Sequence, residues 1–504
     1  MNVNTEKLPL VPVSRKRATA VLAIGGYVNT GILIVQGLLM VPLYLHFVGA
    51  PLYGLWMASG GILGMLGVLN FGVSNMLVQR IANAYGRQDF LKTADYFING
   101  IFVYLAIVLI FMSAGLLVSF FFSELLKVSG GESVMLRGCF QLAVVAAGLG
   151  ILNECLRSFA QALLRPIFSM VTIALSRIVG IAVIISLLFR DAGLWAIPVG
   201  MLFAEILILF FGLIQTVSLF RGLRVKISID STIIKEYFQL GGAMFIARLG
   251  SALSRESAPL LITYFLRPEL TTAYMVTRRA ADMVSQLLAV IYGAAHSAFS
   301  HLVGHGDKEK TSEVATRLLI MIFVFGLVGF VTYVTMNHSF VTLWVGEAFA
   351  LNQEIILMIG IAFFASSLRN MVWQVLNGFG DYQYSSRVIL FEGVGKILLS
   401  AVLLGFLGMP GEPLALVVTS IIAMIAMCVK LQRHVELKIS NKEMVNALVI
   451  TLVLFVFAEL GARMINPSSW VVFVLFLGGV ASVSSVVIVL SGWTKFRGLI
   501  KVRW

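Results

Sequence analysis

The residues best suited to chemistry in this sequence are charged side chains inside long apolar runs. Each run is long enough to cross a bilayer, which takes about 20 apolar residues. An arginine at the bilayer centre costs roughly 2.5–3.5 kcal/mol on insertion scales, so it is unfavourable against lipid. We therefore expect these side chains to face a polar, cationic cavity inside the membrane. Two runs, 236–266 and 270–303, carry four such arginines: Arg248, Arg255, Arg278 and Arg279.

The spacing of these arginines predicts shared helix faces. Arg248 and Arg255 are almost two helical turns apart and project from one face, with Ser251 close to that face. Arg278 and Asp282 share a face of the next helix. Guanidinium groups bind phosphate through two parallel hydrogen bonds and stay charged when desolvated. The pattern favours a site for a diphosphate or another anionic group.

Ion pairing is the alternative explanation for the same charges. Arg255 or Arg278 could pair with Asp282, while Glu256 pairs elsewhere, and such pairs would only lock the two helices together. The two runs contain more arginines than carboxylates, so pairing alone leaves positive charge over. Ligand binding is therefore the favoured hypothesis.

Three more basic residues lie near the middle of predicted spans. Arg177 lies in the fifth span, where Glu205 of the next span is a candidate partner. Lys396 follows Glu392 by four residues, the favourable order for a pair within one helix, so pairing and ligand binding are equally compatible with it. Arg369 has no evident partner in its own helix and is the better ligand candidate.

Intramembrane carboxylates are candidates for coupling transport to a proton or sodium ion, because such acids often serve that role. Each of them also has a basic neighbour, so ion pairing remains an alternative. The candidates are Glu154, Glu205, Glu256, Asp282 and Glu392.

A polar run closes the second predicted span. Its side chains either line the mouth of the cavity and bind sugar hydroxyls, or simply end a helix near the lipid headgroups. The run consists of Asn70, Asn75, Gln79 and Arg80.

Motifs for metals and nucleotides are not evident. His296, His301 and His305 are too few, and too unevenly spaced, to predict a metal site. The three cysteines have no metal or disulfide pattern. No nucleotide-binding glycine loop and no nucleophile elbow occur in the chain. We expect no cofactor and no enzyme activity.

Composition indicates the elements that must position these residues. Of 504 residues, 59% are hydrophobic and only 12% are charged, whereas soluble proteins are about 25% charged. This predicts an all-α polytopic membrane protein. About fourteen spans are expected, at 18–46, 51–78, 94–122, 134–161, 166–189, 194–220, 236–266, 270–303, 313–340, 354–377, 385–407, 413–430, 444–463 and 470–492.

The net charge of +13 reflects loop lysines and arginines, which set membrane orientation, so we expect no nucleic-acid partner. With the basic N-terminus placed inside, 25 lysines and arginines lie on the cytoplasmic side and 5 outside. This bias predicts that both termini are cytoplasmic. The apolar run from Ala18 to Phe47 lacks a cleavage site and is expected to be a retained span.

An internal repeat indicates two halves. Pro42 precedes Pro51 by nine residues, and Pro259 precedes Pro268 by the same distance. "RIVGIAVIISLLF" from Arg177 is echoed by "EGVGKILLSAVLL". Six spans per half make the repeats parallel. The expected domains are a six-helix lobe (1–220), a cytoplasmic linker (221–235), a second six-helix lobe (236–435), and two extra helices with a basic tail (436–504).

Several stretches resemble the Wzx-type oligosaccharide flippases of bacterial polysaccharide assembly, in the multidrug/oligosaccharidyl-lipid/polysaccharide exporter superfamily. They are "LNFGVSNMLVQRIANAYGRQD" (69–89), "AAHSAFSHLVGHGDKEKTSEV" (294–314), "FVTLWVGEAF" (340–349) and "LNGFGDYQ" (376–383). The resemblance implies two six-helix lobes around a central cavity, plus two extra helices, in the bacterial inner membrane. It implies export of an undecaprenyl-diphosphate-linked oligosaccharide, such as an O-antigen unit of lipopolysaccharide biosynthesis or an exopolysaccharide repeat unit. Membrane lipids and polysaccharide assembly proteins are the implied partners.

Two other functions are compatible with a membrane protein of this kind. A multidrug antiporter of the same superfamily usually carries cations, which a cationic cavity would repel. A membrane polysaccharide polymerase or ligase would need a large outer loop, and no predicted outer loop is longer than about a dozen residues. The flippase is therefore the favoured function.

Overall fold

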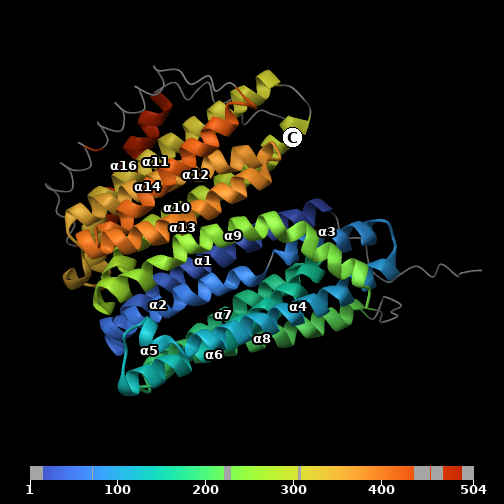
Figure 1. Cartoon of the computed structure of the whole chain (residues 1–504), viewed down its shortest axis with the longest axis horizontal. Helices are drawn as coiled ribbons and strands as arrows, with labels where there is room; N and C mark the ends of the chain where they lie inside the picture. Colours follow the sequence, from blue (N-terminus) through green and yellow to red (C-terminus); the bar gives the residue numbers. More distant parts are fainter. Residues whose placement is uncertain are drawn as a thin grey trace, which may run out of the picture. The chain divides into compact units, whose positions relative to one another are not determined.

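The computed structural model describes residues 15–70, 72–220, 229–304, 308–435, 455 and 469–490. Within these residues the chain is helical and forms no strand, as the composition predicts. The helices fall into two compact units, Met1–Leu249 and Gly250–Trp504. Figure 1 shows the helices with their labels.

The first unit contains the helices of the six N-terminal predicted spans. These are α1 (Arg15–Phe47), α2 (Ala50–Leu66), the 3-10 turn η1 (Gly67–Asn70), α3 (Val73–Gly86), α4 (Phe90–Ser119), the short α5 (Phe122–Leu125), α6 (Gly130–Ala162), α7 (Ile167–Leu188), η2 (Gly193–Trp195) and α8 (Ala196–Phe220). Helix α8 packs against both α6 and α7, and α6 packs against α4. These helices run side by side in Figure 1.

The second unit has an equivalent packing order. Its helices are α10 (Pro268–Gly304), α11 (Lys308–Val345), the turn η3 (Glu347–Phe349), α12 (Gln353–Gly378), α13 (Tyr382–Leu407), α14 (Gly411–Leu431) and α16 (Trp470–Leu490). Helix α14 packs against α12 and α13, as α8 does against α6 and α7. Buried side chains such as Ile262, Met371 and Leu376 form its apolar core.

Helix α9 (Ser231–Phe265) contains the division between the units, at Leu249 and Gly250. The sequence placed the join earlier, in the linker 221–235. The first turns of α9 belong with unit 1, because the Tyr237 hydroxyl donates to the Tyr96 carbonyl of α4 at 3.1 Å. Its later turns cross α13, where Gly250 and Gly393 meet backbone to backbone. The predicted domain boundaries stay a prediction.

The predicted spans match the observed helices to within a few residues, with two qualifications. Of the thirteenth span, 444–463, only residue 455 is among the described residues. The second, predicted as one run over 51–78, is interrupted after α2 by η1 and Gly72. Gly72 has a φ of 67°, a left-handed conformation that residues other than glycine rarely adopt. The break was missed because apolar residues continue on both sides of it.

The lengths and apolar composition of the helices are those of membrane-spanning helices. Among the described residues, ten helices are long and apolar enough to cross a bilayer: α1, α2 with η1, α4, α6, α7, α8 with η2, α11, α12, α13 and α14. The chain is a multi-pass membrane protein. Helices α9 and α10, which carry the predicted arginine cluster, stand outside that set of ten.

Candidate functional site

The break in the second span, at Asn70 and Gly72, brings polar groups together within unit 1. Arg248 lies against this break. A Cβ atom placed on Gly72 would be 3.5 Å from the Arg248 guanidinium carbon, so this group packs on the Gly72 backbone. Helix α3 starts at the next residue, and no side chain caps its N-terminus. Its first backbone N–H groups and the Arg248 charge therefore lie close together, which suits an anion. We call Asn70, Gly72 and Arg248 the break site.

A carboxylate from α6 reaches the same break. Glu154 accepts a hydrogen bond of 2.5 Å from the Asn70 amide. The structure thus joins two residues that the sequence offered for different roles, a sugar ligand and an ion-coupling acid. Asn70 is buried and its Oδ1 atom has no hydrogen-bond partner among the described residues.

A second amide–carboxylate pair lies one residue away along α6. The Asn153 amide donates to the Glu205 carboxylate at 2.7 Å and to the Glu205 carbonyl at 3.0 Å. The predicted ion pair of Arg177 with Glu205 does not form. Arg177 instead donates to Asn29 of α1 at 2.5 Å, although the Glu205 charge still acts on it. Sequence reasoning missed Asn29 and Asn153 because neutral amides carry no charge signal.

In unit 2, Arg369 forms an ion pair with a carboxylate. The sequence had shown no partner for it within its own helix. Its guanidinium lies 3.1 Å from Glu392 on α13, and Ser420 of α14 donates to the other carboxylate oxygen at 2.8 Å. Residue spacing in the sequence indicates only partners within the same helix. The actual partner comes from the neighbouring helix, which only packing brings close.

Lys396 also has a different partner from the expected Glu392. Its ammonium lies 2.6 Å from Glu412 at the start of α14 and donates to Ser257 of α9 at 3.0 Å. The Tyr274 hydroxyl donates to the other Glu412 oxygen. Lys396 and Glu412 are 0% and 1% exposed. The sequence did not indicate Glu412, because it lies between Pro410 and Pro413 in a stretch that resembles a loop, just before the predicted span.

The four arginines of α9 and α10 fall into two kinds. Arg278 pairs with Asp282 at 3.1 Å, which is the ion-pairing alternative. Arg255, whose side chain is 66% exposed, forms a long ion pair of 3.7 Å with its neighbour Glu256. Arg248 is exposed, and the Arg279 Nε atom is buried without a hydrogen-bond partner in the described part of the chain. A ligand role for Arg248, Arg255 and Arg279 stays a prediction.

The remaining predicted site residues are only partly described. Ser251 and Arg80 are half-buried, and Gln79 is exposed. The side chains of Asn75, His296 and His301, and all of His305, lie outside the described residues. No group of three metal-ligating side chains occurs among the residues that the structure describes.

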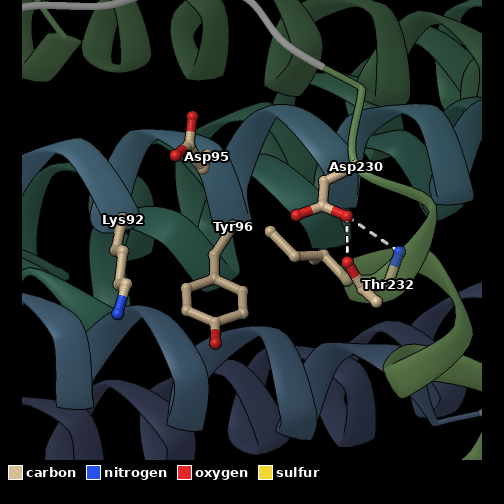
Figure 2. Close-up of a pocket in the computed structure, with 6 residues that line it drawn as sticks. Lys92, Asp95, Tyr96, Asp230 and Thr232 are labelled. Atoms are coloured by element: carbon tan, nitrogen blue, oxygen red, sulfur yellow. Dashed lines mark hydrogen bonds between the residues drawn. The ribbon is translucent and has the colours of Figure 1, made fainter.

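A separate polar pocket of about 440 Å³ lies in unit 1, between the first turns of α4 and α9. Figure 2 shows Lys92, Asp95 and Tyr96 from α4, with Asp230 just before α9 and Thr232 in its first turn. Asp230 accepts hydrogen bonds from the hydroxyl and the backbone N–H of Thr232, which lower the pKa of its carboxyl. The Asp230 backbone N–H donates to Asn99 of α4 at 2.8 Å. This pocket contains none of the predicted site residues.

Comparison with known protein families identifies the family of this chain. Residues 61–354, more than half of the chain, match a family described as polysaccharide biosynthesis protein. The chain belongs to this family. A search of curated protein sequences finds no match.

The solved structures similar to this family member share its fold. The lipid II flippase MurJ, in an inward closed conformation, matches with a TM-score of 0.69 at 12% identity, covering 95% of this chain and 100% of MurJ. An inward-facing multidrug resistance transporter of the MATE family and the MOP superfamily gives 0.65 at 14% identity, over 82% and 98%. A eukaryotic MATE transporter gives 0.60 at 16% identity, over 85% and 96%. The fold is that of MurJ and the MATE transporters.

Proposed function

We propose that this protein is a flippase for an isoprenoid-diphosphate-linked oligosaccharide. It would carry an O-antigen or exopolysaccharide unit from the cytoplasmic to the periplasmic leaflet of the bacterial inner membrane, with both termini cytoplasmic. The family concerns polysaccharide biosynthesis, and a similar structure is that of a lipid II flippase. The protein would act as a transporter and catalyse no covalent chemistry.

The observation that carries the proposal is Arg248 over the break of the second span. Arg248 follows the start of α9 by seventeen residues, or about 25 Å along the helix. The uncapped N-terminus of α3 meets it there. An arginine and a helix N-terminus together bind phosphate oxygens well, and half-helix N-termini bind anionic substrate groups in other transporters.

Arg255 and Arg279, which belong to unit 2, are two further arginines that we propose as ligands of an anionic headgroup. Arg255 lies two turns beyond Arg248 on the same face of α9, and its contact with Glu256 is long and exposed. The Arg279 Nε atom is buried and lacks an acceptor among the described residues. An incoming phosphate oxygen would satisfy it. The isoprenoid tail would stay in lipid while the headgroup crosses, since a bare diphosphate cannot enter hydrocarbon.

The residues with complete ion pairs have a weaker claim to the substrate. Arg278, Arg369 and Lys396 are each matched by a carboxylate. A diphosphate would have to displace that carboxylate inside the protein. We assign these three a structural part in the proposed transporter and leave the headgroup to the other arginines.

The test is leaflet assignment of labelled lipid-linked oligosaccharide in a strain that lacks the gene and is complemented with variants. Arg248→Ala, Arg255→Ala and Arg279→Ala should each stop export, and the Lys variants should retain part of it. Loss of one charge-assisted hydrogen bond costs about 1.5–3 kcal/mol, or roughly ten- to a hundredfold in affinity.

Arg267→Ala is the matched control, because Arg267 lies exposed between α9 and α10. It should export normally. Normal export by all three Ala variants would contradict the binding role. Export of cationic drugs in place of the oligosaccharide would favour the multidrug antiporter, and accumulation of unpolymerised units on the outer leaflet would favour the polymerase or ligase.

A further inference from the structure

Two asparagine–glutamate pairs meet at consecutive residues of α6. Glu154 accepts from Asn70 of η1 at 2.5 Å. Asn153 donates to Glu205 of α8 at 2.7 Å. In each pair the amide nitrogen is the donor and the carboxylate is the acceptor, so both contacts fit an ionised acid.

Each asparagine leaves its other amide atom unsatisfied. Asn70 and Asn153 are only 8% and 7% exposed. Their Oδ1 atoms have no hydrogen-bond partner in the described residues. A buried acceptor without a donor is unfavourable and calls for an explanation. Here both unsatisfied acceptors belong to amides that already contact a carboxylate.

A proton on the carboxylate supplies the missing donor. A protonated carboxyl has one O–H group and a carbonyl oxygen. Facing an amide, the carbonyl accepts from Nδ2–H while the O–H donates to Oδ1, which closes a ring of two hydrogen bonds. The ionised acid can form only the first of these bonds. Uptake of a proton from water would therefore add one hydrogen bond to the pair and remove a partly buried charge.

We propose that Asn70–Glu154 and Asn153–Glu205 are proton-binding sites, each taking up one proton on its glutamate. This names the coupling ion among the alternatives of proton and sodium. The role of that ion as the counter-ion of export rests on the proposed flippase function, whereas proton binding itself does not.

Charged and titratable groups lie around both pairs. Arg177 on α7 and Arg157 on α6 are the basic groups near Glu205. Near Glu154 are Tyr104 of α4, with Cys155 and Arg157 on its own helix. Neither glutamate has a basic group within ion-pair distance among the described residues, and Glu154 is half-buried.

The second unit provides an internal contrast. Arg369, Glu392 and Ser420 lie 216, 215 and 215 residues after Asn153, Arg177 and Glu205, on the equivalent helices α12, α13 and α14. An arginine stands where unit 1 has the amide, and it forms an ion pair of 3.1 Å with Glu392. Glu392 is thus a membrane carboxylate held by an arginine and not by an amide, which makes it the control for the two amide-held glutamates.

The experiment is infrared difference spectroscopy of the purified full-length protein between alkaline and acidic pH, without substrate. Protonated carboxyl groups give a carbonyl band that ionised ones lack. We expect Glu154→Gln and Glu205→Gln each to remove part of this band, and Glu392→Gln to leave it unchanged. Asn70→Asp and Asn153→Asp should move the titration midpoint to higher pH, because two adjacent carboxylates cannot both ionise easily.

The opposite results would overturn the proposal. These are a carbonyl band that survives in both glutamine variants, Asp variants with an unchanged midpoint, or a spectrum that responds to sodium chloride and not to pH. Since no oligosaccharide is present, a failure here is distinct from a failure of the export assay. A protein that binds protons and exports no oligosaccharide would keep this inference and refute the flippase.

Discussion

Lys396 shows how packing redefines a single charged residue. Its ammonium contacts Glu412 and Ser257, and all three side chains are buried. Glu412 is held in turn by Tyr274. Four helices, α9, α10, α13 and α14, thus meet at one ion pair. A buried pair adds little net stability, but removing one partner leaves an uncompensated charge inside the protein.

We expect Lys396→Met to lower the stability of the protein by about 3–5 kcal/mol. The double variant Lys396→Met/Glu412→Gln should recover most of the loss, because no charge then remains buried. The midpoint of thermal unfolding of the purified protein measures both. Lys430→Met is the control, since Lys430 lies 3.7 Å from Asp381 in a partly exposed pair, where the cost is about 0–1 kcal/mol.

A stable Lys396→Met protein that fails to export would reverse this assignment. It would return Lys396 to the substrate ligands, the role that the sequence left open for it. Loss of stability without recovery in the double variant would instead mean that the site needs its polar contacts and not only charge balance.

At the scale of elements, close helix packing depends on glycines that face each other. A Cβ on Gly393 of α13 would lie 2.2 Å from the Gly250 carbonyl oxygen of α9, and one on Gly250 would lie 2.3 Å from the Ile389 carbonyl oxygen. Neither backbone can move aside without shifting a whole helix. Gly180 and Gly200 bring α7 and α8 together in a similar way in unit 1.

Gly393→Ala should therefore destabilise the packing of α9 on α13, by about 1–3 kcal/mol as for other overpacked cores. Gly395→Ala on the same helix should be neutral or stabilising, because its nearest neighbour, a Thr419 methyl, would be 3.8 Å away and alanine favours a helix. Limited proteolysis and thermal unfolding compare the two. Equal behaviour of both variants would contradict close backbone packing as the cause.

The break between α2 and α3 is the other feature that acts at this scale. It turns the backbone at Gly72 and exposes a helix N-terminus where a continuous helix would have none. Asn70 can then meet Glu154, and Arg248 can lie against the chain. The proposed anion site and one proposed proton site both depend on this interruption.

At the scale of the whole molecule, orientation follows from the distribution of charge. Of the 37 lysines and arginines, 25 are assigned to the predicted cytoplasmic side, 5 to the outside, and the remaining 7 lie within spans away from their ends. The seven are the residues proposed from the sequence as ligands. The excess of the others in the loops predicted to be cytoplasmic is the basis of the predicted topology.

Reporter fusions test this orientation. Alkaline phosphatase fused after Asp191, between α7 and η2, should be active because that loop is predicted to lie outside. A fluorescent protein fused after Arg433, beyond α14, should fold and fluoresce in the cytoplasm. The reverse pattern of activity would contradict the predicted topology and, with it, the proposed direction of export.

The sequence by itself determined the class of protein, the positions of the described spans and which charged residues lie inside those spans. Runs of apolar residues are a local property, and bilayer thickness converts them directly into helix lengths. Charges inside those runs, such as Arg248 and Glu154, are visible for the same reason. The family resemblance found in short motifs is confirmed by the match over residues 61–354.

The tertiary structure alone decided which charges are matched. Lys396 joined Glu412 and not Glu392, Arg369 found Glu392, and Arg177 took Asn29. Spacing along one helix reveals only partners three or four residues away, whereas these partners come from other helices. A side chain in the membrane selects its partner by distance across a packed interface, and that distance exists only once the helices have assembled.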